Sequence, residues 1–254
     1  MVLDRNRGGA YLTMLIASAG MFGIMLFLTY YLQQTLDFSP VVTGLAFLPM
    51  IGCLMATSIA SNVALMPRTG PRPLAPTGML LAAGGLAWLT RIGVHSSYPT
   101  AVLPSLLVMG AGLGLVFAPV FNTGTFGVAP RDAGVASATV NTGQQLGGSI
   151  GTSLLNTIFA SAVASYTAAH LSGATTASRP STQLAGLAAI HGYTVAFWVS
   201  AAIFAVGALI AAILFRAGPL TSPGQQPQPG APAHATGTLA TSGATPAPAP
   251  PTAG

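Results

Sequence analysis

The amino-acid sequence predicts an all-α protein with six transmembrane helices, embedded in a lipid bilayer. Charged residues make up only 4% of the 254 residues and hydrophobic residues make up 52%, whereas a soluble domain carries about 25% charged residues. Long apolar segments alternate with polar turns, and each segment approaches the roughly 20 residues that a helix needs to cross a bilayer. A chain of this composition cannot cover a surface in water, so the lipid bilayer is its expected partner.

The expected helices follow one another along residues 10–217 and form one transmembrane bundle. Tyr30 and Tyr31 end the first helix, where tyrosine suits the headgroup region of the membrane. Ser39 and Pro40 are a typical helix start, with a hydroxyl cap followed by proline in the first turn. Residues 67–73 contain proline and glycine and predict a turn between the second and third helices. The six helices are expected at about residues 11–31, 41–66, 74–92, 100–121, 132–164 and 193–215.

The two ends of the chain differ from the bundle in composition. Residues 1–9 are polar and form a short N-terminal segment. Residues 218–254 contain nine prolines together with alanine and glycine and almost no bulky apolar side chain. Such a segment cannot offset the entropy of ordering, so a disordered tail is expected there.

The arginines predict how the bundle is oriented, because cytoplasmic loops carry an excess of positive charge. With six helices both termini share one side of the membrane. Six of the eight arginines fall on that side: Arg5, Arg7, Arg68, Arg72, Arg131 and Arg216. Only Arg91 and Arg179 fall on the other. We therefore expect a multi-pass protein of the cell membrane with both termini and the tail in the cytoplasm.

The fifth helix carries an unusual polar stripe, at steps of four, three, four and four residues: Ser137, Asn141, Gln144, Gly148 and Thr152. This spacing places the stripe on one helical face. A lipid-facing amide costs several kcal/mol, so the stripe must face other helices or water inside a protein. For Gly147, Gly148 and Gly151 alone, close helix packing is the favoured interpretation. The amides, with the neighbouring Gln145, favour the wall of a wet internal passage.

Four stretches of the chain resemble a known family: residues 10–50, RTGPRPL at 68–74, 105–119, and DAGVASATVNTGQQLGGSIG at 132–151. The sequence resembles the C-terminal six helices of the 14-span drug/proton antiporters (EmrB/QacA type) of the major facilitator superfamily. This resemblance implies one half of a two-bundle transporter, which exports small lipophilic or cationic solutes by alternating access, coupled to protons. It also implies a partner, either an N-terminal half of six to eight spans or a second copy, because the chain starts ten residues before its first span. The alternative is a truncated, non-transporting structural membrane fragment.

The resemblance also implies candidate site residues, because in this family the first and fourth helices line the central cavity and the second and fifth meet the other half. Arg68, Gly70 and Arg72 match the family's cytoplasmic gating turn, although the acid of that turn is missing here. Interhelical packing or hydrogen bonding is the alternative role for the cavity candidates. These candidates for contact with a small-molecule substrate are Phe22, Met25, Leu26, Thr29, Tyr30, Gln33, Phe117, Asn122, Ser137, Asn141, Gln144, Gln145 and Thr152.

Other kinds of chemistry are not expected. The acids are Asp4, Asp37 and Asp132, all at expected membrane surfaces, so we assign no proton-coupling residue to this chain. Ser149 has no histidine or acid at its depth to complete a catalytic relay, so the chain is not expected to be an enzyme. The single cysteine excludes a disulfide framework, and no cofactor or metal site is indicated. The arginines form no basic patch, so no nucleic-acid partner is expected.

Overall fold

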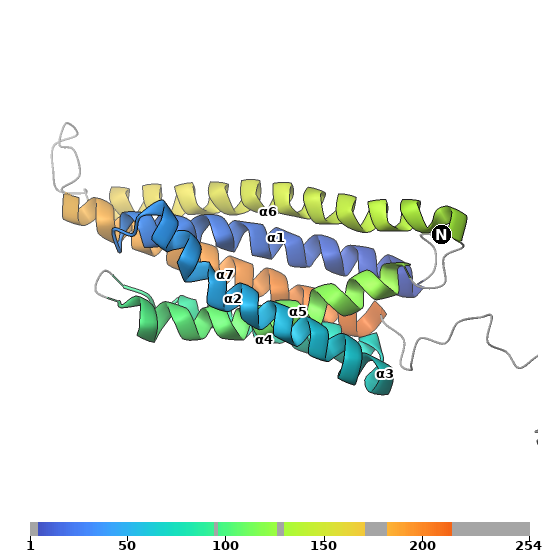
Figure 1. The fold of residues 1–254 in the computed structure, drawn as a ribbon. Helices are drawn as coiled ribbons and strands as arrows, with labels where there is room; N and C mark the ends of the chain where they lie inside the picture. Colours follow the sequence, from blue (N-terminus) through green and yellow to red (C-terminus); the bar gives the residue numbers. More distant parts are fainter. Residues whose placement is uncertain (1–4, 94–95, 126–129, 171–181, 215–254) are drawn as a thin grey trace, which may run out of the picture. The chain divides into compact units, whose positions relative to one another are not determined.

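The computed structural model describes residues 5–93, 96–125, 130–170 and 182–214, and the fold is given for these ranges. Residues 1–222 form one compact unit that contains every described helix, and residues 223–254 lie outside the described ranges. The described part of the chain consists of helices joined by short turns and has no strand (Figure 1). It therefore agrees with the predicted all-α class. The predicted disordered tail falls outside the described residues.

Each predicted apolar segment contains a helix, but the bounds differ: α1 begins at Arg5, within the predicted N-terminal segment 1–9, and α6 continues to His170 rather than ending at about residue 164. A single turn of π-helix, η1, continues α2 into the short α3, and another such turn, η2, precedes α5. The elements in order are α1 (Arg5–Gln34), α2 (Pro40–Ala60), η1 (Ser61–Leu65), α3 (Met66–Thr69), α4 (Pro71–Leu89), η2 (Tyr98–Val102), α5 (Leu103–Thr125), the 3-10 turn η3 (Pro130–Asp132), α6 (Ala133–His170) and α7 (Thr182–Leu214).

Five of the described helical stretches are long and apolar enough to cross a membrane: Gly8–Gln34, Pro40–Thr69, Tyr98–Thr125, Ala133–His170 and Gln183–Leu214. The 19 residues of α4 are not among them, because Arg72 and the prolines of its first turns lower its mean hydropathy. The described part is thus a bundle with at least five membrane-spanning candidates. The count of six crossings stays a prediction.

Two further boundaries differ from the sequence prediction. The turn between the second and third helices is confined to Gly70, whose φ of 71° lies in the left-handed region that glycine adopts without strain. In addition, α7 begins at Thr182 rather than at about residue 193. Its first turns pack on α6: Ala188 is fully buried, and Gly192 lies against Phe159. The helix therefore includes residues 182–192, which the sequence prediction leaves between its last two helices, and packing on α6 stabilises this extension.

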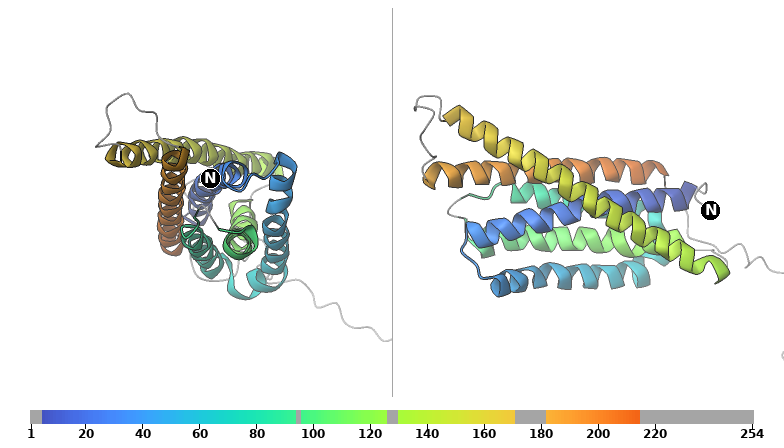
Figure 2. Two further views of the ribbon diagram at one scale, coloured as in Figure 1. Left: turned by 90° about the vertical axis from the view of Figure 1, so that its left-hand side faces the viewer. Right: turned by 90° about the horizontal axis from the view of Figure 1, so that it is seen from above.

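The helices surround two central members, α1 and α5 (Figure 2). α1 packs on α6, α7 and α5, whereas α5 packs on α4 and α2. α4 also packs on α7, which closes that side of the bundle. The other two helices lie at the margins, with α2 mainly on α5 and α6 mainly on α1 and α7. Parts of α1 and α5 therefore stay uncovered between the two marginal helices.

An aromatic cluster joins α1, α6 and α7 near one end of the bundle. The ring centroids of Phe27 and Phe159 are 5.1 Å apart, and Phe159 stacks on Tyr193 at 5.1 Å. Tyr31 meets Tyr193 edge-on at 6.1 Å, and its hydroxyl donates to the carbonyl oxygen of Gly93 at 3.0 Å. This bond connects the end of α1 to the turn that follows α4.

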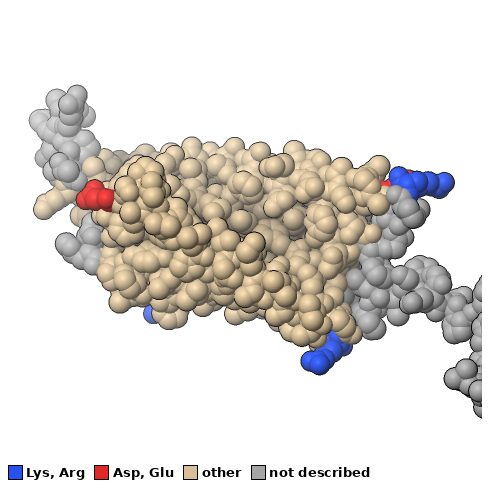
Figure 3. Space-filling model, in the orientation of Figure 1, with Lys and Arg blue, Asp and Glu red and all other residues tan. Residues whose placement is uncertain are grey.

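The charged side chains of the described residues lie at helix ends, and on the face shown in Figure 3 the surface between the two ends carries none. These residues are Asp37, Arg68, Arg72, Arg91, Arg131 and Asp132. Large apolar side chains are exposed between the ends, for example Ile59 at 65% and Leu209 at 62%. An uncharged apolar belt of this kind suits the hydrocarbon region of a bilayer.

Candidate functional site

The glycines of α6 form its contact with α1. A Cβ atom at Gly147 would overlap the carbonyl oxygen of Leu15, and one at Gly151 would overlap that of Ala19. At Gly148 the added atom would lie 2.8 Å from the ring of Phe22. Small residues let helices in membranes approach to backbone contact. The geometry of these three glycines is the one that a packing role requires.

The polar residues of the α6 stripe lie beside this contact rather than within it. Asn141 and Gln145 are exposed, and Ser137, Gln144 and Thr152 are half-buried. Within the described residues no hydrogen bond involves the side-chain amides of Asn141, Gln144 or Gln145. These amides therefore keep their hydrogen-bonding capacity for water, for a ligand or for a further helix.

The candidates on α1 continue the same surface. Phe22 and Tyr30 are exposed, and Met25, Leu26, Thr29 and Gln33 are half-buried. The Thr29 hydroxyl donates to the carbonyl oxygen of Met25 at 2.6 Å, which satisfies it within its own helix. The candidates on α1 thus present two aromatic rings and one unbonded amide, that of Gln33, between half-buried apolar groups.

A groove of about 340 Å³ brings part of the predicted set together. It joins the ring of Phe22 on α1 to Gln145 and Thr152 on α6, with Ser149 and Ser153 beside them. The Ser149 hydroxyl is already bonded to the carbonyl oxygen of Gln145 at 3.0 Å. An aromatic ring with neighbouring amide and hydroxyl groups suits a ligand that is largely apolar with a few polar atoms.

On α5 the structure shows a partner that the sequence analysis missed. The Asn122 amide donates to the side-chain oxygen of Asn62 at 2.6 Å, which joins α5 to η1. Asn122 is exposed and Asn62 is half-buried, while Phe117, five residues before Asn122, packs on the core. In the sequence, Asn62 stands out only as a single amide within an apolar segment, which is the one sign that it has a polar partner. π-Helical turns are frequent at functional sites.

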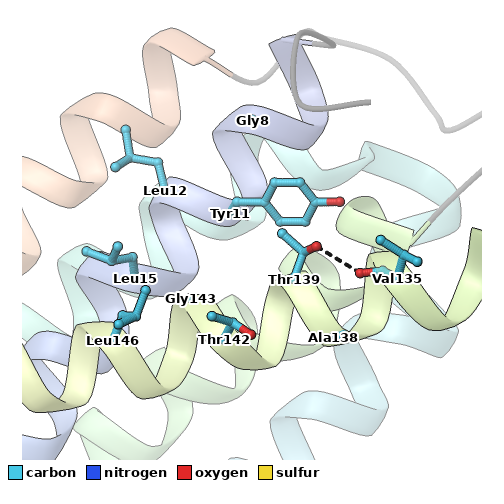
Figure 4. A pocket seen from close by; sticks show the side chains of 10 residues that line it. All are labelled: Gly8, Tyr11, Leu12, Leu15, Val135, Ala138, Thr139, Thr142, Gly143 and Leu146. Carbon is cyan, nitrogen blue, oxygen red and sulfur yellow. Dashed lines mark hydrogen bonds between the residues drawn. The ribbon is translucent and has the colours of Figure 1, made fainter.

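A larger hollow of about 590 Å³ lies between the first halves of α1 and α6, and none of the predicted cavity residues lines it (Figure 4). Two of its three hydroxyl groups are bonded within the protein. Tyr11 donates to the carbonyl oxygen of Gly124 at 3.1 Å, and Thr139 donates to that of Val135 at 2.8 Å. The remaining lining is mostly apolar: Gly8, Leu12, Leu15, Ala138, Thr142, Gly143 and Leu146. Leu12 and Leu15 project into it from α1 (Figure 4).

The predicted gating turn lies at the junction of α3 and α4. Arg68 and Arg72 are both exposed on either side of Gly70. Among the described residues the ion pair present joins Arg131 to Asp132 at 3.7 Å, so neither arginine of the turn meets a described acid. The described residues also contain no group of three histidine, cysteine or acidic side chains able to hold a metal ion.

These features define a multi-pass helical membrane protein with an uncharged, amide-bearing face. The chain belongs to the Major Facilitator Superfamily, whose sequence profile matches residues 2–152. This family consists of transporters and not of enzymes.

Similar proteins include a puromycin resistance protein, pur8, of Streptomyces alboniger, 43% identical over 213 residues that cover 83% of this chain and 40% of that protein. A multidrug resistance protein B homolog of Mycobacterium tuberculosis is 35% identical over 162 residues, 62% of this chain and 30% of its own length. The cephamycin export protein CmcT of Amycolatopsis lactamdurans is 33% identical over 151 residues, 59% of this chain and 31% of its own. The chain spans less than half the length of these relatives.

Proposed function

We propose that this chain is one six-helix half of a drug exporter of the 14-span drug/proton antiporter branch, and that it moves small lipophilic or cationic molecules out of the cell. The observation that carries this proposal is the groove in which Phe22 meets Gln145 and Thr152 on a surface without charged groups. Relatives named for puromycin resistance, multidrug resistance and cephamycin export support it.

The proposal requires a second bundle. The candidate residues lie on a face that is open between α2 and α6, and transporters of this kind bind substrate between two bundles that rock against each other. We infer that a second bundle covers this face, whether it belongs to the same polypeptide, to another one or to a second copy of this chain. Asn141, Gln144 and Gln145 then border the shared aqueous gap.

Proton coupling and orientation are part of the same proposal. Asp37 and Asp132 lie at helix ends, and no acid lies within a described helix span. A proton relay needs a titratable group inside the membrane, so we place it in the second bundle. The arginine distribution supports a cell-membrane protein with both termini in the cytoplasm.

Thiol labelling tests whether the stripe is wet. Cys53 is the single cysteine, so Cys53→Ala gives a background for new cysteines. In the assembled transporter we expect Asn141→Cys and Gln145→Cys to react with a membrane-impermeant thiol reagent, and puromycin to slow that reaction. The matched control is Ile150→Cys on the same helix, which is 56% exposed but faces lipid in this proposal and should not react.

Transport assays separate the export proposal from its alternative. With the second bundle present, Gln145→Leu should slow efflux of puromycin and of a lipophilic cation such as ethidium, whereas Ile150→Leu should not. If labelling at 141 and 145 equals that at 150, or if Gln145→Leu leaves efflux unchanged, the stripe packs against other helices. If no efflux is seen with any of the candidate second bundles, whether an N-terminal half or a second copy of this chain, the alternative of a non-transporting membrane fragment is favoured.

A further inference from the structure

A hollow of about 410 Å³ lies between the end of α4 and the middle of α7, helices that contribute no residue to the candidate cavity. Its volume falls within the range of about 300–1,000 Å³ that is usual for small-molecule sites. Nothing lies within 4 Å of a Cβ atom added at Gly84, so this residue borders open space within the hollow. The other lining residues are Ala87, Trp88, Thr90, Arg91 and Trp198.

Both tryptophans of the chain line this one hollow. Trp88 lies in the last turn of α4 and is 50% exposed, and Trp198 lies on α7 and is 57% exposed. In the described structure neither indole N–H donates a hydrogen bond to the protein. Tryptophan is enriched where hydrocarbon meets headgroups, because its ring is apolar and its N–H is polar. The pair therefore marks the level of the membrane interface on this side.

Arg91 supplies a positive charge at the same place. Its side chain is exposed, and it forms no ion pair with either described acid, Asp37 or Asp132. The Thr90 hydroxyl donates to the carbonyl oxygen of Ala87 at 2.7 Å, so it is not available to a ligand. The side-chain donors that remain for a ligand in this hollow are the Arg91 guanidinium and the two indole N–H groups. A guanidinium at the membrane border binds phosphate oxygens strongly, since both its geometry and its charge match them.

Apolar side chains extend from the hollow toward the middle of the bundle. Leu80, Gly84 and Trp88 follow one another at steps of four along one face of α4, and Trp198, Ala202 and Val206 do so on α7. Leu80 is 56% exposed and Val206 is 55% exposed. The acyl chains of a bound lipid would lie along these two rows.

We propose that this hollow binds a phospholipid with an anionic headgroup, held by Arg91 and the two indole N–H groups. A zwitterionic lipid presents its own ammonium group beside the phosphate, so it competes poorly for a single arginine. One arginine close to an anionic lipid surface favours binding about five-fold. The inference concerns lipid recognition and holds whether or not the chain transports drugs.

Brominated lipids test the proposal on the whole chain, because Trp88 and Trp198 supply all its tryptophan fluorescence. The purified protein is placed in phosphatidylcholine vesicles that contain a minor share of either brominated phosphatidylglycerol or brominated phosphatidylcholine. We expect the anionic bromolipid to be enriched about five-fold at the tryptophans over the zwitterionic one. Arg91→Gln should abolish this enrichment, and Arg91→Lys should retain most of it.

Matched controls make the outcome decisive. Arg131→Gln, at the opposite end of the bundle, should keep the enrichment, and quenching by brominated phosphatidylcholine should be the same in every variant that is folded. Equal quenching by the two bromolipids in the wild-type protein, or enrichment that survives Arg91→Gln, overturns the proposal. Relief of the anionic quenching by inorganic phosphate also overturns it, since the ligand is then a soluble phosphate compound.

Discussion

Replacing Gly151 by alanine perturbs the contact between α1 and α6 at its tightest point. The added Cβ atom would overlap the backbone of Ala19, and backbone atoms cannot turn aside as a side chain can. Overpacking costs about 1–3 kcal/mol, while the better helix propensity of alanine offsets about 0.5–1 kcal/mol of this. We expect the free energy of unfolding to fall by about 1–2 kcal/mol, which is a factor of roughly 5–30 in the folded-to-unfolded ratio.

The assay is reversible unfolding in mixed micelles, in which SDS is titrated and tryptophan fluorescence is recorded. Two other glycines of α6 serve as controls. At Gly148 the added atom would meet the ring of Phe22, which can rotate, so Gly148→Ala should cost less. At Gly134 nothing lies within 4 Å of the added atom, so Gly134→Ala should be neutral or slightly stabilising. Equal stabilities for Gly151→Ala and Gly134→Ala would refute the backbone contact.

Two further predictions concern side-chain hydrogen bonds. In a double-mutant cycle of Asn62→Ala and Asn122→Ala, we expect a coupling of about 0.5–1 kcal/mol in the same unfolding assay, whereas additive effects would show that the two amides do not interact. Tyr31→Phe removes the hydroxyl that donates to Gly93 and should lower the free energy of unfolding by about 0.5–1.5 kcal/mol. The matched control is Tyr30→Phe at the adjacent exposed position, which should leave stability unchanged; a comparable loss there would contradict this role of the Tyr31 hydroxyl.

Much of the helical framework follows from local chemistry. Ser39 and Pro40 predict the start of α2, and the structure confirms it: the Ser39 hydroxyl accepts a hydrogen bond from the Val42 N–H at 3.3 Å, and the helix begins at Pro40. The apolar segments likewise predict where helices lie, because backbone groups in lipid must bond within their own segment. The start of α7 at Thr182 was not predicted, although residues 183–190 are largely apolar; in the structure Ala188 of this stretch is fully buried.

The candidate site was less predictable than the framework. Periodicity puts Gln144 and Gly148 on one face of α6, but it does not say which neighbour that face meets. The structure divides the stripe, with Gly148 against α1 and the amide of Gln144 at the margin of the contact. Asn62 was overlooked because a single amide has no spacing to reveal it; its role depends on the approach of Asn122 from a helix distant in the sequence.

The close packing of α6 on α1 limits how these two helices can move relative to each other. With Gly147 against Leu15 and Gly151 against Ala19, carbonyl oxygens of α1 lie where Cβ atoms of α6 would otherwise be. A shift of one position would bring Ile150 or Thr152 to the place of Gly151, against the carbonyl oxygen of Ala19, so we expect the two helices to keep their register and to move as one rigid body. If the proposed second bundle rocks against this one, we therefore expect α1 and α6 to move together as one side of the shared gap.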